Sequence, residues 1–152
     1  MYKNITILIF FLFLMSNCDY TPIYSGNKSE NFSIEKVNYD GNIEINNLIN
    51  KKIKIYQKDK KSKIFNIDVN SSYEKIPQSK DLKGKTTDYK IIIKVIFKIE
   101  NNQKITVLQT QEDFVIKNIT NKFEERKYEK IKKENLTQLI FNSLIIQLSQ
   151  IK

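Results

Sequence analysis

The alternation of apolar and polar positions along the chain is most regular between residues 90 and 99. In an extended conformation, one side of this stretch carries only apolar residues, and the other carries lysines separated by isoleucines. The first set is Ile91, Ile93, Val95, Phe97 and Ile99, and the second is Lys90, Ile92, Lys94, Ile96 and Lys98. This alternation predicts a strand with one face in the core. Weaker alternation predicts strands over residues 32–39, 63–73 and 104–117, and the first of these changes face between Ile34 and Val37.

Helical spacing of apolar residues occurs first over residues 42–58, at Ile45, Ile49, Ile53 and Tyr56. Lysines crowd the second half of this segment, where cations favour the negative end of a helix dipole. We therefore predict a helix here whose basic side is solvated.

A second helix is predicted to begin at Asn121, because Glu124 stands three residues later, as in a capping box. Its first half mixes acids and bases, including Glu129 and Lys133, and this pattern is typical of a wet surface. Its second half, residues 136–151, is apolar around almost its whole circumference. We expect this half to be largely buried, either against its own sheet or in another protein.

Two connections complete the pattern. Residues 74–87 contain Pro77 and Gly84 and are predicted to form a long loop. Residues 100–103 are predicted to form a tight hairpin, because asparagine tolerates the positive φ that such turns need.

The order of these elements is strand, helix, strand, strand, strand, helix. A helical crossover makes the first two strands parallel, whereas the hairpin adds an antiparallel continuation. The predicted fold class is therefore α+β, a two-layer sandwich with two helices packed on one face of a mixed four-stranded sheet. We predict a single domain over residues 32–152.

The N-terminal segment follows a different pattern. After Lys3, residues 5–15 are apolar except for Thr6, a run too short to span a bilayer but of suitable length for an export signal. Cys18 is the single cysteine and stands at the end of this run. We predict a lipoprotein signal peptide over residues 1–17 and a lipidated N-terminus and tether over residues 18–31. The alternative is that Cys18 is merely the tail of a cleaved leader or of an N-terminal anchor.

The residues Cys18, Tyr20, Pro22, Ile23 and Tyr24 resemble the mature start of the LptE family of lipopolysaccharide-assembly lipoproteins, especially the alphaproteobacterial type. The resemblance implies an outer-membrane protein that is lipid-anchored on the periplasmic side. It also implies a complex with the β-barrel LptD, in whose lumen the domain acts as a plug while lipopolysaccharide is transported to the outer membrane.

Two residues depart from the family's pattern. Asn17 stands where lipoprotein signals usually have Gly, Ala or Ser, and Asp19 replaces the family's glycine. Asp after a lipidated cysteine is an inner-membrane retention signal in enteric bacteria. A lipid-anchored accessory subunit of an envelope lipid transporter, held at the inner membrane, is therefore one alternative. A pilotin-like assembly factor that binds a peptide of a secretion channel is another.

Composition limits the chemistry of the chain. The formal net charge is +9, which favours an anionic partner, while export disfavours nucleic acid. The sequence has no histidine and three scattered glycines, so no imidazole-based site or phosphate-cradling loop is expected. We predict no enzyme activity, no metal and no cofactor other than the covalent lipid on Cys18.

The candidate binding site is the lysine face of the regular strand. Ammonium groups can meet phosphate, and isoleucines between them can meet acyl chains. We predict that Lys90, Lys94 and Lys98, together with Lys83 and Lys85 in the preceding loop, contact lipopolysaccharide. The alternative is a solvated outer face whose isoleucines are placed there by β-propensity.

Overall fold

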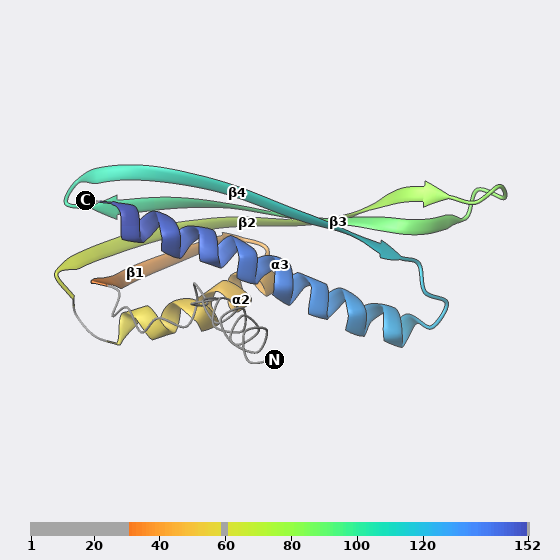
Figure 1. The fold of residues 1–152 in the computed structure, drawn as a ribbon, viewed down its shortest axis with the longest axis horizontal. Helices are drawn as coiled ribbons and strands as arrows, with labels where there is room; N and C mark the ends of the chain where they lie inside the picture. Colours follow the sequence, from red (N-terminus) through yellow and green to blue (C-terminus); the bar gives the residue numbers. More distant parts are fainter. Residues whose placement is uncertain (1–30, 59–60, 152) are drawn as a thin grey trace, which may run out of the picture.

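The computed structural model of the chain describes residues 31–58 and 61–151. The sheet consists of β1 (Phe32–Gly41), β2 (Lys63–Lys80), β3 (Thr86–Asn101) and β4 (Lys104–Lys117). The helices are α2 (Ile43–Ile53), its 3₁₀ continuation η1 (Lys54–Gln57), and α3 (Lys122–Gln150). Figure 1 shows the sheet as one layer and both helices as the second. The predicted fold class is confirmed.

The sheet has the strand order β1-β2-β3-β4. The β1 strand is parallel to β2, and the other neighbouring pairs are antiparallel. In β1 the register shifts between Ile34 and Lys36, which is a bulge at the position where the sequence predicts a change of face. The helical crossover and the β3–β4 hairpin therefore give the predicted mixed sheet.

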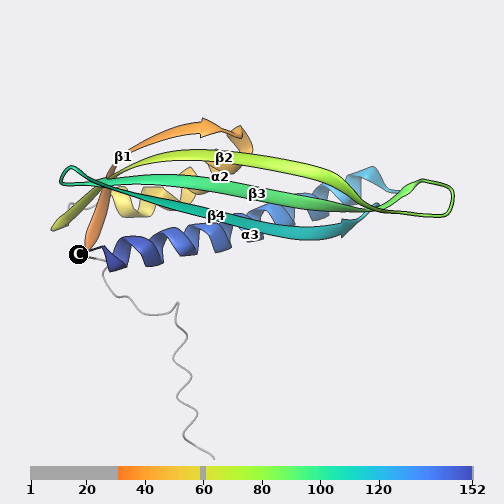
Figure 2. The same cartoon turned by 90° about the horizontal axis from the view of Figure 1, so that it is seen from above.

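The hydrophobic core lies between the sheet and the two helices. The β3 strand contributes its odd-numbered apolar residues, all at most 1% exposed, and α3 contributes Leu136, Ile140, Leu144 and Leu148. The α2 helix adds Ile45, Ile49 and Ile53. Figure 2 shows α3 crossing under the sheet at an angle, with its C-terminal half along β4 and its N-terminal half directed toward β2. Because α2 and α3 cover the same face, no helix within residues 31–58 and 61–151 lies over the lysine side of β3.

The turn from β1 into α2 depends on a glycine. Gly41 has a φ of 89°, and a Cβ at this position would lie 2.0 Å from the backbone oxygen of Ser71. Asn42 then caps α2 by accepting a hydrogen bond from the Ile45 amide at 3.0 Å. The buried Asn46 fixes the same corner, since it donates to the Asp40 carbonyl and accepts from the Ser71 hydroxyl.

The prediction of a long loop over residues 74–87 is wrong. The β2 strand continues to Lys80 and β3 begins at Thr86, so only a short turn separates them. Pro77 is accommodated beside a register shift between Pro77 and Ser79. Figure 1 shows the β2–β3 hairpin projecting beyond the ends of the helices.

The two halves of α3 also differ from the predictions. In the second half Leu139 and Ile146 are about half exposed, so the predicted burial around nearly the full circumference is wrong there. In the first half Glu125 and Lys133 are buried rather than solvated, because both face charged partners on other elements. Asn121 does cap the helix, accepting from the amides of Phe123 and Glu124. Within residues 31–58 and 61–151, no helix combines the length and apolar character needed to cross a bilayer.

Candidate functional site

The structure brings three of the five predicted lysines together on the uncovered face of the sheet. Lys90, Lys94 and Lys98 alternate along β3 with Ile92 and Ile96, while the intervening residues point into the core. We call these five residues the basic face. It is central in the sheet, because β2 and β4 both pair with β3 along this stretch.

The three lysines of the basic face differ in their partners. Lys90 forms an ion pair with Asp113 of β4 at 3.1 Å. Lys94 lies between Ser72 and Gln111 in register, and Lys98 lies between Asp68 and Val107. Within the described part of the chain, neither Lys94 nor Lys98 forms an ion pair. The sheet therefore presents two ammonium groups that remain available to an external anion.

Apolar side chains widen the basic face toward β4. Val107 stands opposite Lys98 and is 63% exposed, and Val115 stands opposite Lys90 and is 46% exposed. Ile76 of β2 flanks Lys90 on the other side. Sequence reasoning missed these three residues, although the alternation in β4 carries the signal for the two valines. The surface thus combines cations with exposed hydrocarbon.

Lys83 and Lys85 lie elsewhere, in the turn of the projecting β2–β3 hairpin. Asp81 organises this turn, since its Oδ1 accepts hydrogen bonds from the amides of Lys83 and Lys85, both at 2.9 Å. Leu82 at the apex is fully exposed. The turn is therefore a second basic and apolar surface, which we call the hairpin tip. The predicted site is split between the basic face and the hairpin tip.

A cluster of buried charges lies on the opposite, helix-covered side of the sheet. Lys75 of β2 donates to Glu125 and Glu129 of α3, each at 2.8 Å, and Lys122 also pairs with Glu125. Tyr73 donates to Glu129 at 2.6 Å. We call these five residues the ion cluster. Because every member has a partner, it joins the first half of α3 to β2.

The pKa values in the ion cluster follow from these contacts. Hydrogen bonds from Lys122 and Lys75 lower the pKa of Glu125. For Glu129, burial acts to raise the pKa, but the bonds from Lys75 and Tyr73 outweigh it and lower the pKa. For Lys75, burial acts to lower the pKa, and the two carboxylates raise it overall. Burial, aided by Glu129, raises the pKa of Tyr73. The shifts of Glu125, Glu129 and Lys75 favour their charged, paired forms, and the shift of Tyr73 keeps its phenol a neutral hydrogen-bond donor. This combination suits a structural role better than acid–base catalysis.

Two further expectations concern sites outside this surface. Cys18 lies outside the described residues. Within residues 31–58 and 61–151, no three acidic or other metal-ligating side chains gather in a group that could hold a metal ion.

Comparison with solved structures places the fold among bacterial lipoproteins. An uncharacterized lipoprotein B from Nitrosomonas europaea matches with a TM-score of 0.56 and 12% identity, covering 79% of this chain and 86% of that one. A minor lipoprotein from Acinetobacter baumannii matches with a TM-score of 0.54 and 11% identity over 76% of this chain and 90% of that one. A putative lipoprotein from Caulobacter crescentus matches with a TM-score of 0.51 and 10% identity, covering 76% of this chain and 87% of that one.

Sequence comparison adds nothing to this likeness. No family model matches the chain, and no curated protein sequence matches it. At these low identities the structural matches concern the fold alone. The chain therefore has a fold that it shares with solved lipoproteins of three bacteria.

Proposed function

We propose that this protein is a lipoprotein, anchored through Cys18, that assists the transport of lipopolysaccharide to the outer membrane. The basic face is the observation that carries the proposal, because Lys94 and Lys98 lack ion-pair partners in the described chain and stand among exposed apolar side chains. Lipopolysaccharide offers both phosphate and acyl groups to such a surface. The fold shared with bacterial lipoproteins and the pattern ending at Cys18 support the anchor.

The proposed partner is an LptD-like β-barrel. In this arrangement the domain is a plug inside the lumen, and its basic face and hairpin tip are offered to the passing glycolipid. The support is the resemblance of residues 18–24 to the LptE family, together with a two-layer domain in which the helices of the described residues leave one face of the sheet uncovered. The role is one of binding and positioning, without a chemical step.

The binding test is a double charge reversal on the basic face. Lys94→Glu with Lys98→Glu should weaken binding to lipopolysaccharide vesicles at least about tenfold, since each lysine near an anionic surface contributes about 1 kcal/mol. The matched control is Lys51→Glu with Lys130→Glu, which makes the same charge change at exposed positions on the helices. Equal loss in both double variants would reduce the effect to net charge, and unchanged binding in the first would remove the basic face as a site.

The partner and the membrane are tested separately. Affinity capture of the acylated protein from membranes should bring down a large β-barrel, whereas capture of a secretion-channel ring would contradict the proposal. Fractionation of the two membranes should place the protein in the outer one. Asp19 favours one alternative, an accessory subunit of a lipid transporter retained at the inner membrane, and recovery there would support that role.

A further inference from the structure

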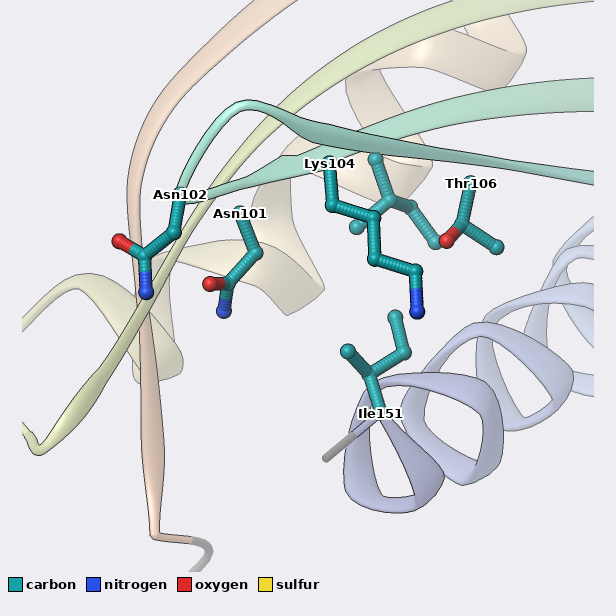
Figure 3. A pocket seen from close by; sticks show the side chains of 6 residues that line it. Asn101, Asn102, Lys104, Thr106 and Ile151 are labelled. Atoms are coloured by element: carbon teal, nitrogen blue, oxygen red, sulfur yellow. The ribbon is translucent and has the colours of Figure 1, made fainter.

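A pocket lies at the end of the sheet where the β3–β4 hairpin turns and α3 ends. Its volume is about 210 Å³, and its lining residues are Ile99, Asn101, Asn102, Lys104, Thr106 and Ile151. Figure 3 shows the side chain of Lys104 reaching from the strand toward Ile151 at the end of the helix. This volume is below the roughly 300–1,000 Å³ usual for small-molecule sites, so the pocket suits a single large side chain better than a metabolite.

The lining of this end pocket is apolar inside and polar at the rim. Ile99 is 1% exposed and stands opposite Thr106 in the strand register. The side chains of Asn101, Asn102 and Lys104 have no hydrogen-bond partner within the part of the chain that the structure describes. The pocket thus offers hydrocarbon walls, amide groups and one ammonium. A ring with a polar tip matches this set, because it can pack on isoleucine, accept a cation over its face and hydrogen-bond at its edge.

The chain that follows Cys18 enters the domain at the same end of the molecule. Ser62 donates to the carbonyl of Asn31 at 3.3 Å, and Phe32 pairs in register with Lys63. Lys63 in turn donates to the carbonyl of Ile151 at 2.8 Å. The first described residue and the end of α3 are therefore joined through the start of β2. The tether thus arrives at the same end of the sheet as the pocket.

We propose that Tyr24 of the tether docks its ring in the end pocket. Tyr24 is the nearest aromatic residue before Asn31, and the intervening residues span up to about 23 Å when extended, which is ample to fold back into the pocket. In the docked state the ring packs between Ile99 and Ile151, Lys104 lies near its face, and its hydroxyl reaches the amides of the hairpin. Residues 20–24 are rich in aromatic and β-branched types, which a solvated spacer does not need.

Docking has a consequence for the position of the domain, which rests on the proposed anchor at Cys18. An undocked tether from Cys18 to Asn31 allows the domain to move up to about 45 Å from the lipid, whereas a docked Tyr24 leaves a spacer of about 20 Å. The end of the molecule that carries the β3–β4 hairpin is then held next to the membrane. The hairpin tip, at the opposite end of the sheet, points away from that membrane (Figure 1).

The test is site-specific photo-cross-linking of the acylated protein in membranes. Benzoylphenylalanine in place of Tyr24 should cross-link to the peptides that contain residues 99–106 or Ile151. Thr106→Phe fills the pocket and should reduce this cross-link at least about tenfold. Val107→Phe is the matched control, since it lies next in the same strand on the opposite face and is 63% exposed, so the cross-link should persist.

Other outcomes overturn the inference. Cross-links only to lipid, to other parts of the domain or to nothing would contradict docking, and this result does not depend on the folding of any pocket variant. A probe in place of Tyr20 that reaches the pocket more efficiently than one at Tyr24 would also contradict it. If mass spectrometry of the membrane-derived protein shows no lipid on Cys18 and the pocket cross-link still forms, the anchor is contradicted and the docking stands.

Discussion

At the scale of single residues, the two glycines with positive φ have different roles. A Cβ atom added to Gly41 would lie 2.0 Å from a backbone oxygen, whereas a Cβ added to Gly84 would have no other atom within 4 Å. Both need the left-handed conformation, which costs other residues about 1–2 kcal/mol. Only at Gly41 does a side chain also collide with a neighbouring strand. The glycine is therefore required there for packing as well as for conformation.

We predict that Gly41→Ala lowers the free energy of unfolding by more than about 2 kcal/mol, because the strained φ adds to the clash with Ser71. Gly84→Ala should cost about 1–2 kcal/mol, since only the backbone strain remains. Urea denaturation of both variants measures the difference. Equal losses would mean that the turn between β1 and α2 relaxes at little cost.

Leu82 provides a prediction about binding at the residue scale. Its side chain is fully exposed at the hairpin tip, so Leu82→Asp should change stability by no more than about 0.5 kcal/mol. If the hairpin tip contacts acyl chains, the same variant should bind lipopolysaccharide vesicles several-fold more weakly. The control is Ile43→Asp, which replaces a 77% exposed residue on α2. Thermal unfolding and vesicle sedimentation measure the two effects, and equal loss of binding in both variants would remove the tip as a contact.

At the scale of elements, the sequence was most informative where a single segment determines its own pattern. The alternation in β3, the period of α2 and the cap at Asn121 all predict what the structure has. The end of β2 could not be predicted, because residues 74–80 are mostly polar, contain Pro77 and are extended through pairing with β3. The burial of Glu125 and Lys133 in the first half of α3 could not be predicted for the same reason, because it too depends on other elements. A pattern of Glu129 and Lys133 on one helix does not reveal Lys75 on a distant strand.

The same limit applies to the candidate site. Alternation predicted that Lys90, Lys94 and Lys98 share a face, and the structure confirms it. It could not predict that Asp113 neutralises Lys90, because that pairing depends on the register between β3 and β4. The separation of Lys83 and Lys85 from this face could not be predicted either, because it depends on the extension of β2 and β3 into a projecting hairpin. The residues that share one face of a strand can therefore be predicted from that strand alone. Their partners on neighbouring strands cannot, because they depend on the register of the sheet.

The ion cluster gives the prediction at the element scale. Glu125→Gln should lower the free energy of unfolding by about 2–3 kcal/mol at pH 7, since it leaves Lys75 and Lys122 without one of their partners on a buried site. Glu124→Gln, at the exposed neighbouring position, should change it by less than about 0.5 kcal/mol. Denaturation of the two variants measures this, and similar values would contradict a stabilising ion cluster.

The cluster also predicts how stability depends on pH. The pKa values of Glu125 and Glu129 are lowered by folding, so their contribution is complete above the ordinary glutamate pKa of about 4.3 and is lost as the pH falls through the lowered values. The double variant Glu125→Gln with Glu129→Gln should therefore lose less stability than the wild type between about pH 5 and pH 2. Denaturant midpoints across this range measure the slopes. If the denaturant midpoints of the wild type and the double variant fall in parallel as the pH is lowered, the groups that make the protein acid-sensitive are not Glu125 and Glu129.

At the scale of the whole molecule, α3 joins two regions of different chemistry. Its second half lies over the apolar core with Leu136, Leu144 and Leu148 buried, and its first half is held to β2 mainly by the ion cluster. Apolar burial is little affected by salt or acid, whereas ion pairs weaken under both. The first half of the helix should therefore open before the second.

Hydrogen exchange measured along α3 tests this division. Amides of residues 136–148 should exchange only through global unfolding, and those of residues 122–133 should exchange through a local opening that is lower in free energy by at least about 2 kcal/mol. Lowering the pH below about 4, through the lowered pKa values of Glu125 and Glu129, should widen the gap, because protonation of these carboxylates removes the partners of Lys75. The Glu124→Gln variant should leave the profile unchanged. Uniform protection of the α3 amides at every pH would mean that the ion cluster and the apolar core unfold as a single cooperative unit. No segment of α3 would then detach while the sheet stays folded.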